Sequence, residues 1–132
     1  MLEGKVAIQD LPDLWNTRMR EYVGITPPDD AHGVLQDIHW SAGMMGYFST
    51  YALGNLVSVQ LWDKLNQDIY GLEDQIRKGR FEELLAWLRA NVHKHGRKYK
   101  PQDLVQKVTG SRITSVPYIR YLTRKYSDIY GL

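Results

Sequence analysis

The sequence contains no cysteine. This absence excludes disulfide bonds and zinc sites built from thiolates, and it is compatible with a reducing compartment. Long hydrophobic runs are missing as well. The most apolar window, Gly43–Leu61, is interrupted by Ser49, Thr50, Gly54, Asn55 and Ser58. No stretch has the length of a membrane span or of a signal-peptide core. We therefore expect a soluble, cytoplasmic protein with no membrane partner.

A strong excess of charge of either sign is also absent. The 132 residues include 17 Lys and Arg against 15 Asp and Glu, a net charge of +2. This balance gives no reason to expect a nucleic-acid partner. Apolar residues make up 43% of the chain, which suits a folded core rather than disorder. We expect residues 1–132 to form a single helical domain or a fragment of a larger protein.

Glycine and proline divide the chain into helix-sized segments, and apolar spacing indicates helices between them. Tyr47–Tyr70 predicts one long helix that is apolar on nearly all sides, a pattern typical of a central buried helix. Gly33–Met45 has no clean period and suggests a short helix or turn. No strand is convincing, although Lys5–Gln9 allows a short extended arm. The predicted fold class is all-α, with one long central buried helix and shorter amphipathic helices packed around it. These shorter helices are expected over Leu11–Val23, over Leu72–Lys78, from Phe81 to Gly96, over Pro101–Gly110 and from Ser115 onward.

Histidine is scarce, and its spacing does not suit a metal site. A hydrolytic zinc site on a helix needs two histidines four residues apart, with a carboxylate ligand nearby. None of the four histidines forms such a pair. His93 and His95 are two residues apart, so they point in different directions around a helix. His32 lies in a polar loop, where exposure explains it. We therefore assign no metal ligand in this chain.

One segment gathers residues that could perform chemistry. Gly33–Tyr51 holds Gln36, Asp37, His39, Trp40, Tyr47 and Tyr51. The two tyrosines are four residues apart, so on a helix both hydroxyls would lie on one face. One imidazole and two phenols aimed at a common point could donate hydrogen bonds to a developing oxyanion. The same residues could equally satisfy one another inside a core. Composition and spacing leave both interpretations open.

In this segment the sequence resembles the Taq-type thermostable metallocarboxypeptidases. GVLQDIHW, over Gly33–Trp40, matches the family motif G-x-x-Q-D-x-H-W at every fixed position. GYFSTYALGN, over Gly46–Asn55, is similar to the family's G-Y-F-P-T-Y-x-L-G-N, with Ser49 in place of proline. Asp10–Met19, Gly79–Tyr99 and Tyr118–Leu132 resemble further family segments, so the resemblance covers essentially the whole chain. It corresponds to roughly the last quarter of a complete enzyme.

The resemblance implies an all-helical, zinc-dependent enzyme that removes single residues from the C-termini of peptides. The family binds zinc through an H-E-x-x-H helix and a later glutamate, and no His-Glu pair occurs in this sequence. By analogy His39 and Tyr47 would bind substrate, and one or both of Tyr47 and Tyr51 would donate to the oxyanion. Gln36 and Asp37 would orient His39 from behind, and Trp40 would pack. The Ser49 departure predicts a small change in rigidity and no change in role.

Two hypotheses follow from the sequence. In the first, the chain is the C-terminal, substrate-side portion of a zinc metallocarboxypeptidase and is inactive alone. Its partners would be the missing N-terminal metal-binding part and a peptide substrate, and zinc would be the cofactor of the complete enzyme only. In the second, it is a stand-alone helical interaction or assembly module derived from that enzyme, perhaps a homo-oligomer, because exposed apolar surface favours association.

Overall fold

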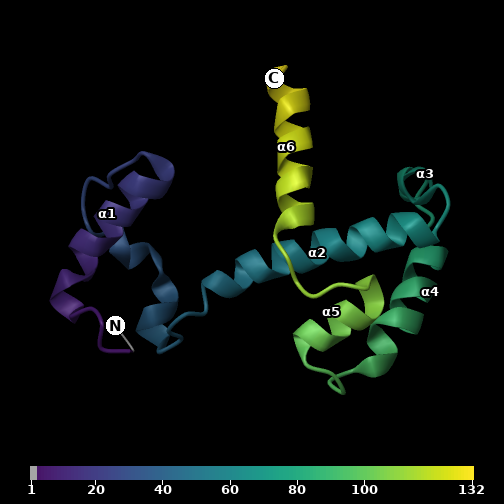
Figure 1. The fold of residues 1–132 in the computed structure, drawn as a ribbon, viewed down its shortest axis with the longest axis horizontal. Coiled ribbons are helices and arrows are strands. Elements are labelled where there is room, and N and C mark those ends of the chain that lie inside the picture. Colours follow the sequence, from purple (N-terminus) through teal and green to yellow (C-terminus); the bar gives the residue numbers. More distant parts are fainter. Residues whose placement is uncertain (1–2) are drawn as a thin grey trace. The chain divides into compact units, whose positions relative to one another are not determined.

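A computed structural model describes residues 3–132, and every regular element in that range is a helix. The expected all-α fold class is confirmed. The chain divides into two compact units, one up to Phe48 and one over Ser49–Leu132, which are described separately (Figure 1). The single-domain arrangement therefore stays a prediction. Within the described residues, no helix combines the length and the apolar character needed to cross a membrane.

The first unit is built around α1, Leu11–Val23, whose predicted bounds are confirmed. Pro12 lies in its first turn, and Gly24 ends it in the left-handed conformation at φ 77°. The expected arm at Lys5–Gln9 is wrong, because bends there lead into a 3₁₀ turn, η1, at Ile8–Asp10. Two more 3₁₀ turns follow α1: η2 at Val34–Gln36 and η3 at Ile38–Ala42. The region predicted to be a short helix or turn is thus a pair of tight turns.

The second unit is organised by α2, Ser49–Asp68, which begins two residues later than the sequence predicted. Both α5, Pro101–Thr109, and α6, Val116–Tyr130, pack against α2, which is therefore central as expected (Figure 1). The remaining helices are α3, Leu72–Arg77, and α4, Glu82–Asn91. The α4 segment was expected to continue to Gly96. Instead the backbone leaves the helix at Val92, at φ −118°, and His93–His95 forms the 3₁₀ turn η4.

Burial of α2 is confined to its second half. The core cluster consists of Leu65, Ile69 and Leu72, with Ile76, Leu84 and Trp87 packed against it. In the first turns of the helix, by contrast, Tyr51 and Leu53 are 56% and 48% exposed. The sequence pattern correctly indicated a central helix, but the buried part is shorter than its apolar run. Large apolar side chains therefore remain exposed at the start of α2.

A buried polar residue ties α2 to the segment between α5 and α6. Gln60 is 4% exposed. Its amide nitrogen donates to Ser111 Oγ at 3.2 Å and to the Arg112 carbonyl at 3.1 Å. Its amide oxygen accepts from the Thr114 backbone N–H at 3.0 Å. A buried amide that satisfies both of its ends fixes the linker, and with it the starting point of α6.

Candidate functional site

The site in the first unit begins with Asp37, which caps the 3₁₀ turn that carries His39. Asp37 Oδ1 accepts from the His39 backbone N–H at 3.2 Å and lies 2.7 Å from His39 Nδ1. A carboxylate only accepts, so the ring proton lies on Nδ1, which donates to Asp37. The two side chains are 14% and 10% exposed for His39 and Asp37. The predicted orienting role of Asp37 thus has a direct geometric basis.

Two aromatic rings lie against the imidazole of His39. The Tyr47 ring centroid is 5.0 Å from that of His39, with the planes tilted by 38°. Phe48 meets the same imidazole edge-on at 5.5 Å. Sequence reasoning included Tyr47 and missed Phe48. The available signal was that Phe48 directly follows Tyr47, but the contact depends on how the chain turns after Gly43. Together Asp37 and the two rings fix the orientation of the imidazole.

The two tyrosines do not share a helix face, and that expectation is wrong. Tyr47 lies before α2, in a turn where its N–H meets the Met44 carbonyl at 3.3 Å. Gly46, at φ 76°, allows this turn because glycine adopts positive φ without strain. Tyr51 lies in the first turn of α2, in the second unit. The structure therefore brings together His39 and Tyr47, and Tyr51 is described only within its own unit.

Gln36 and Trp40 make contacts that differ from those of Asp37. Gln36 is exposed, and its side-chain amide donates to the Ala31 carbonyl in the preceding loop. Its predicted role in orienting His39 and its surroundings stays a prediction. Trp40 is half-buried and lines a small apolar hollow of about 200 Å³, as expected for a packing residue. The other lining residues are Leu11, Leu14, Trp15, Arg18 and Val34.

A second His–Asp pair in the same unit has nearly the same local geometry. His32 Nδ1 lies 2.7 Å from Asp29 Oδ1, which also accepts from the His32 backbone N–H at 2.9 Å. This pair is open to solvent, with side chains 69% and 56% exposed. The hydrogen bond from the His32 side chain, followed by that from its backbone, lowers the pKa of Asp29. The sequence correctly placed His32 in an exposed loop.

The described residues do not fit a metal ion by themselves. Within residues 3–132, no group of three or more His, Asp or Glu side chains could hold one. The His39–Asp37 pair supplies only two candidate ligands, and Nδ1 of His39 is engaged by Asp37. A catalytic zinc needs three protein ligands and an open position.

The comparison with known families decides the assignment. A family model of the carboxypeptidase Taq (M32) metallopeptidases matches residues 1–126. The chain belongs to this family. M32 enzymes are zinc metallopeptidases, although the residues described here do not supply such a site.

Curated M32 relatives are much longer than this chain. It is 38% identical over 131 residues to thermostable carboxypeptidase 1 of Thermus thermophilus, covering 99% of the chain and 26% of that relative. It is 40% identical over 132 residues to carboxypeptidase 1 of Bacillus subtilis, covering 100% of the chain and 26% of that protein. The chain thus spans about a quarter of the length of the relatives it matches, and it corresponds to part of an M32 carboxypeptidase.

Solved structures give the same result. This chain is similar to an M32 carboxypeptidase from Deinococcus radiodurans, with a TM-score of 0.89 and 39% sequence identity. The match covers 99% of this chain and 27% of the Deinococcus chain. Metallocarboxypeptidase 1 of Trypanosoma cruzi matches 95% of this chain with 26% of its own, at TM-score 0.86 and 34% identity. The helical fold of this chain is therefore that of a segment of M32 carboxypeptidases.

Proposed function

We propose that this chain forms the C-terminal, substrate-side portion of a zinc metallocarboxypeptidase that removes C-terminal residues from peptides. The metal-binding part would come from polypeptide outside these residues, and the chain alone would be inactive. The observation that carries the proposal is the cluster of Asp37, His39 and Tyr47. In this cluster a largely buried imidazole is oriented by a carboxylate and has a phenol ring beside it. The chain belongs to a family of metallopeptidases, and residues 3–132 contain no group of side chains that could hold a metal ion.

In this proposal His39 contacts the peptide backbone or the tetrahedral intermediate through Nε2. Its other ring nitrogen already donates to Asp37 at 2.7 Å. Nε2 is then an acceptor when the imidazole is neutral and a donor only when it is protonated. Donation to an oxyanion therefore requires the imidazolium form of His39 with Asp37 ionised beside it. A fixed donor of this kind stabilises charge that develops in the transition state.

We assign the oxyanion-directed hydroxyl first to Tyr47. Its ring lies beside that of His39, with the centroids 5.0 Å apart, which supports a joint contact with the substrate. Tyr51 remains the second candidate, because it matches the family motif and lies four residues further along. Either phenol O–H can donate a hydrogen bond. The proposal is that one hydroxyl and one imidazolium share the task.

The proposal is tested by hydrolysis of a blocked dipeptide by the purified chain, with zinc added and then removed by a chelator. We expect the rate to stay at the buffer background in both conditions, because three protein ligands are needed to form a catalytic zinc site. Chelator-sensitive turnover by the chain alone would overturn the assignment of the metal to another polypeptide.

A second candidate function is a stand-alone interaction or assembly module. The observation that favours it is exposed apolar surface on α6, where Ile119 and Ile129 are 55% and 59% exposed. Surface of this kind is typical of interfaces. Light scattering over a concentration series discriminates the two functions. A stable oligomer that buries α6 would support the module, and a monomer at all concentrations would reject it.

A further inference from the structure

The second unit contains an open groove whose lining residues are not part of the candidate site. It has a volume of about 560 Å³ and is formed by α2, the end of α4, α5 and the loop between η4 and α5. Its walls are aliphatic, from Val57, Leu61, Val92, Leu104, Val105 and Val108. The volume lies within the range of small-molecule sites in proteins, about 300–1,000 Å³. We call it the aliphatic groove.

The mouth of the aliphatic groove carries charges of one sign. Arg97, Lys98 and Lys100 line it, and Tyr99 lies between them. Lys98 Nζ and Lys107 Nζ lie 5.9 Å and 5.6 Å from the centre of the Tyr99 ring. These four cations are the basic rim. In the described residues, none of them forms an ion pair with a carboxylate.

The electrostatic environment of His95 shows that the positive charge is concentrated here. His95 packs edge-on against Tyr99 at 5.2 Å. Its pKa is lowered by partial burial, and then by Lys94, Lys107 and Lys98. The one nearby acid on α5, Asp103, lies 4.0 Å from Arg112 rather than from the basic rim. An anion at the mouth would therefore meet uncompensated positive charge.

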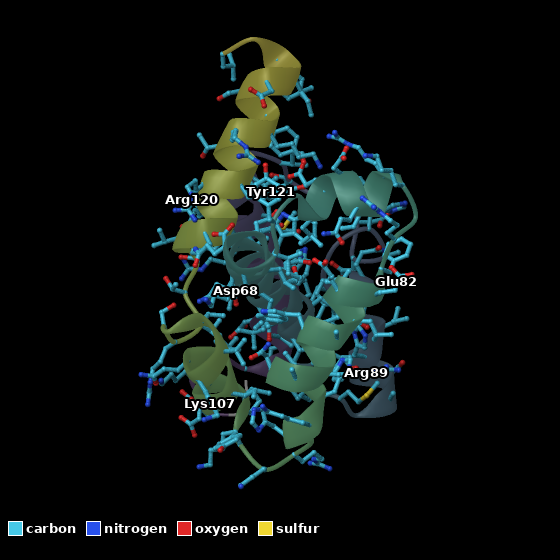
Figure 2. The ribbon with its side chains drawn as sticks, turned by 90° about the vertical axis from the view of Figure 1, so that its right-hand side faces the viewer. Asp68, Glu82, Arg89, Lys107, Arg120 and Tyr121 are labelled. Carbon is cyan, nitrogen blue, oxygen red and sulfur yellow. The ribbon has the colours of Figure 1, made fainter. Side chains whose placement is uncertain are left out.

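A second hollow in the same unit is lined by residues of both charges, so it does not favour an anion. It lies between α2 and α6 and mixes acids with bases: Asp63, Glu73, Arg120 and Arg124. Its Arg120 is already paired with Asp63 at 2.6 Å. Figure 2 shows Arg120 and Tyr121 on α6, and Lys107 on α5. Of these two hollows in the second unit, the groove by α5 is the one that combines aliphatic walls with cations that form no ion pair in the described residues.

We propose that the aliphatic groove binds a long-chain aliphatic carboxylate, with its alkyl chain against the valine and leucine walls and its carboxylate at the basic rim. Aliphatic walls favour an alkyl chain, because burying each methylene adds free energy without requiring a polar partner. The rim supplies ammonium and guanidinium donors that match a carboxylate in charge and hydrogen bonding. A neutral or cationic amphiphile would satisfy the walls and leave the rim uncompensated.

The test is a titration of the ¹⁵N-labelled 132-residue chain with sodium dodecanoate below its micellar concentration. We expect saturable amide shifts confined to the groove, at Gly96, Tyr99, Val105 and Val108. Affinity should rise about two- to fourfold per methylene from octanoate to dodecanoate. Lys98→Glu combined with Lys107→Glu should weaken binding about tenfold. Arg124→Glu combined with Lys125→Glu on α6, the same number of charge reversals outside the groove, should leave binding within about twofold.

Several results would overturn the proposal. Equal binding of dodecyltrimethylammonium would show that the rim does not select an anion, and it requires no variant that could misfold. Shifts spread over α6, or affinity independent of chain length, would show non-specific adsorption. Tighter binding of an acidic peptide than of dodecanoate would assign the groove to a protein partner instead.

Discussion

The two His–Asp pairs of the first unit differ in surroundings and hardly in geometry. In both, the histidine Nδ1 lies 2.7 Å from an aspartate oxygen that also accepts from the histidine backbone N–H. The His32–Asp29 side chains are 69% and 56% exposed, whereas those of His39–Asp37 are 14% and 10% exposed. A local Asp–His hydrogen bond is therefore no sign of function by itself. Burial and the neighbouring aromatic rings distinguish the pair at His39.

The largest effect should come from removing the two imidazoles in turn. We consider a chimera in which this chain replaces the matching quarter of Bacillus subtilis carboxypeptidase 1. His39→Ala should lower kcat/KM about 100- to 1,000-fold, because a transition-state donor is lost. His32→Ala should change it less than about threefold, since exposed pairs contribute little. Steady-state kinetics on a blocked dipeptide measure both. Equal decreases of kcat/KM in the two variants would show that the buried pair at His39 is no more important for catalysis than the exposed pair at His32.

The next largest effect should separate the two tyrosines. Tyr47→Phe in the chimera should lower kcat about 100-fold, with KM nearly unchanged, because the substitution removes the hydroxyl that we propose donates to the oxyanion. Tyr51→Phe should cost less than about threefold. Both variants keep the ring, so circular dichroism should show unchanged helix content. A larger decrease for Tyr51→Phe than for Tyr47→Phe would assign the donor hydroxyl to Tyr51, in the first turn of α2.

Replacing the aspartate of each His–Asp pair by asparagine should have an intermediate effect on kcat/KM. Asp37→Asn keeps the shape but removes the ionised acceptor that fixes the proton on His39 Nδ1, so kcat/KM should fall about tenfold. Asp29→Asn is the matched control and should leave kcat/KM within about threefold. Equal losses of kcat/KM in the two variants would mean that Asp37 does not act through His39.

The smallest effect concerns the titration of the exposed pair. His32→Ala removes the largest cause of the lowered pKa of Asp29, so that pKa should rise toward its ordinary value. A lowered folded-state pKa stabilises the protein above the unfolded-state value, about 3.9, and this contribution is lost as pH falls through the folded-state pKa. A ¹³C carboxyl titration of both proteins measures the change. An unchanged pKa of Asp29 would show that the hydrogen bonds from His32 do not lower it.

Glycine and proline marked the limits of some helices and not of others, since α4 ends well before Gly96. The bounds of α1 are confirmed because Pro12 suits a first turn and Gly24 provides a left-handed end. The start of α2 was missed because Gly46 allows a turn that an apolar pattern does not reveal. The tyrosine spacing was therefore misread as a shared helix face. Spacing rules hold only once the helix limits are known.

The site and the core were predictable to different degrees. His39, Asp37 and Tyr47 came from the motif, but the contact with Phe48 required the folded turn. Burial of α2 was overestimated because its apolar pattern extends over turns that are exposed in this structure. Gln60 was missed because its partners lie more than 50 residues away, at separations of 51, 52 and 54.

We propose that this chain orients the hydrogen-bond donors and that other polypeptide holds the metal. A comparison of peptide hydrolysis by the chimera and by the chain alone, at equal zinc concentration, tests this proposal. We expect chelator-sensitive release of C-terminal residues by the chimera and background rates from the chain. Turnover by the chain alone, or a folded, zinc-loaded chimera without activity, would contradict it.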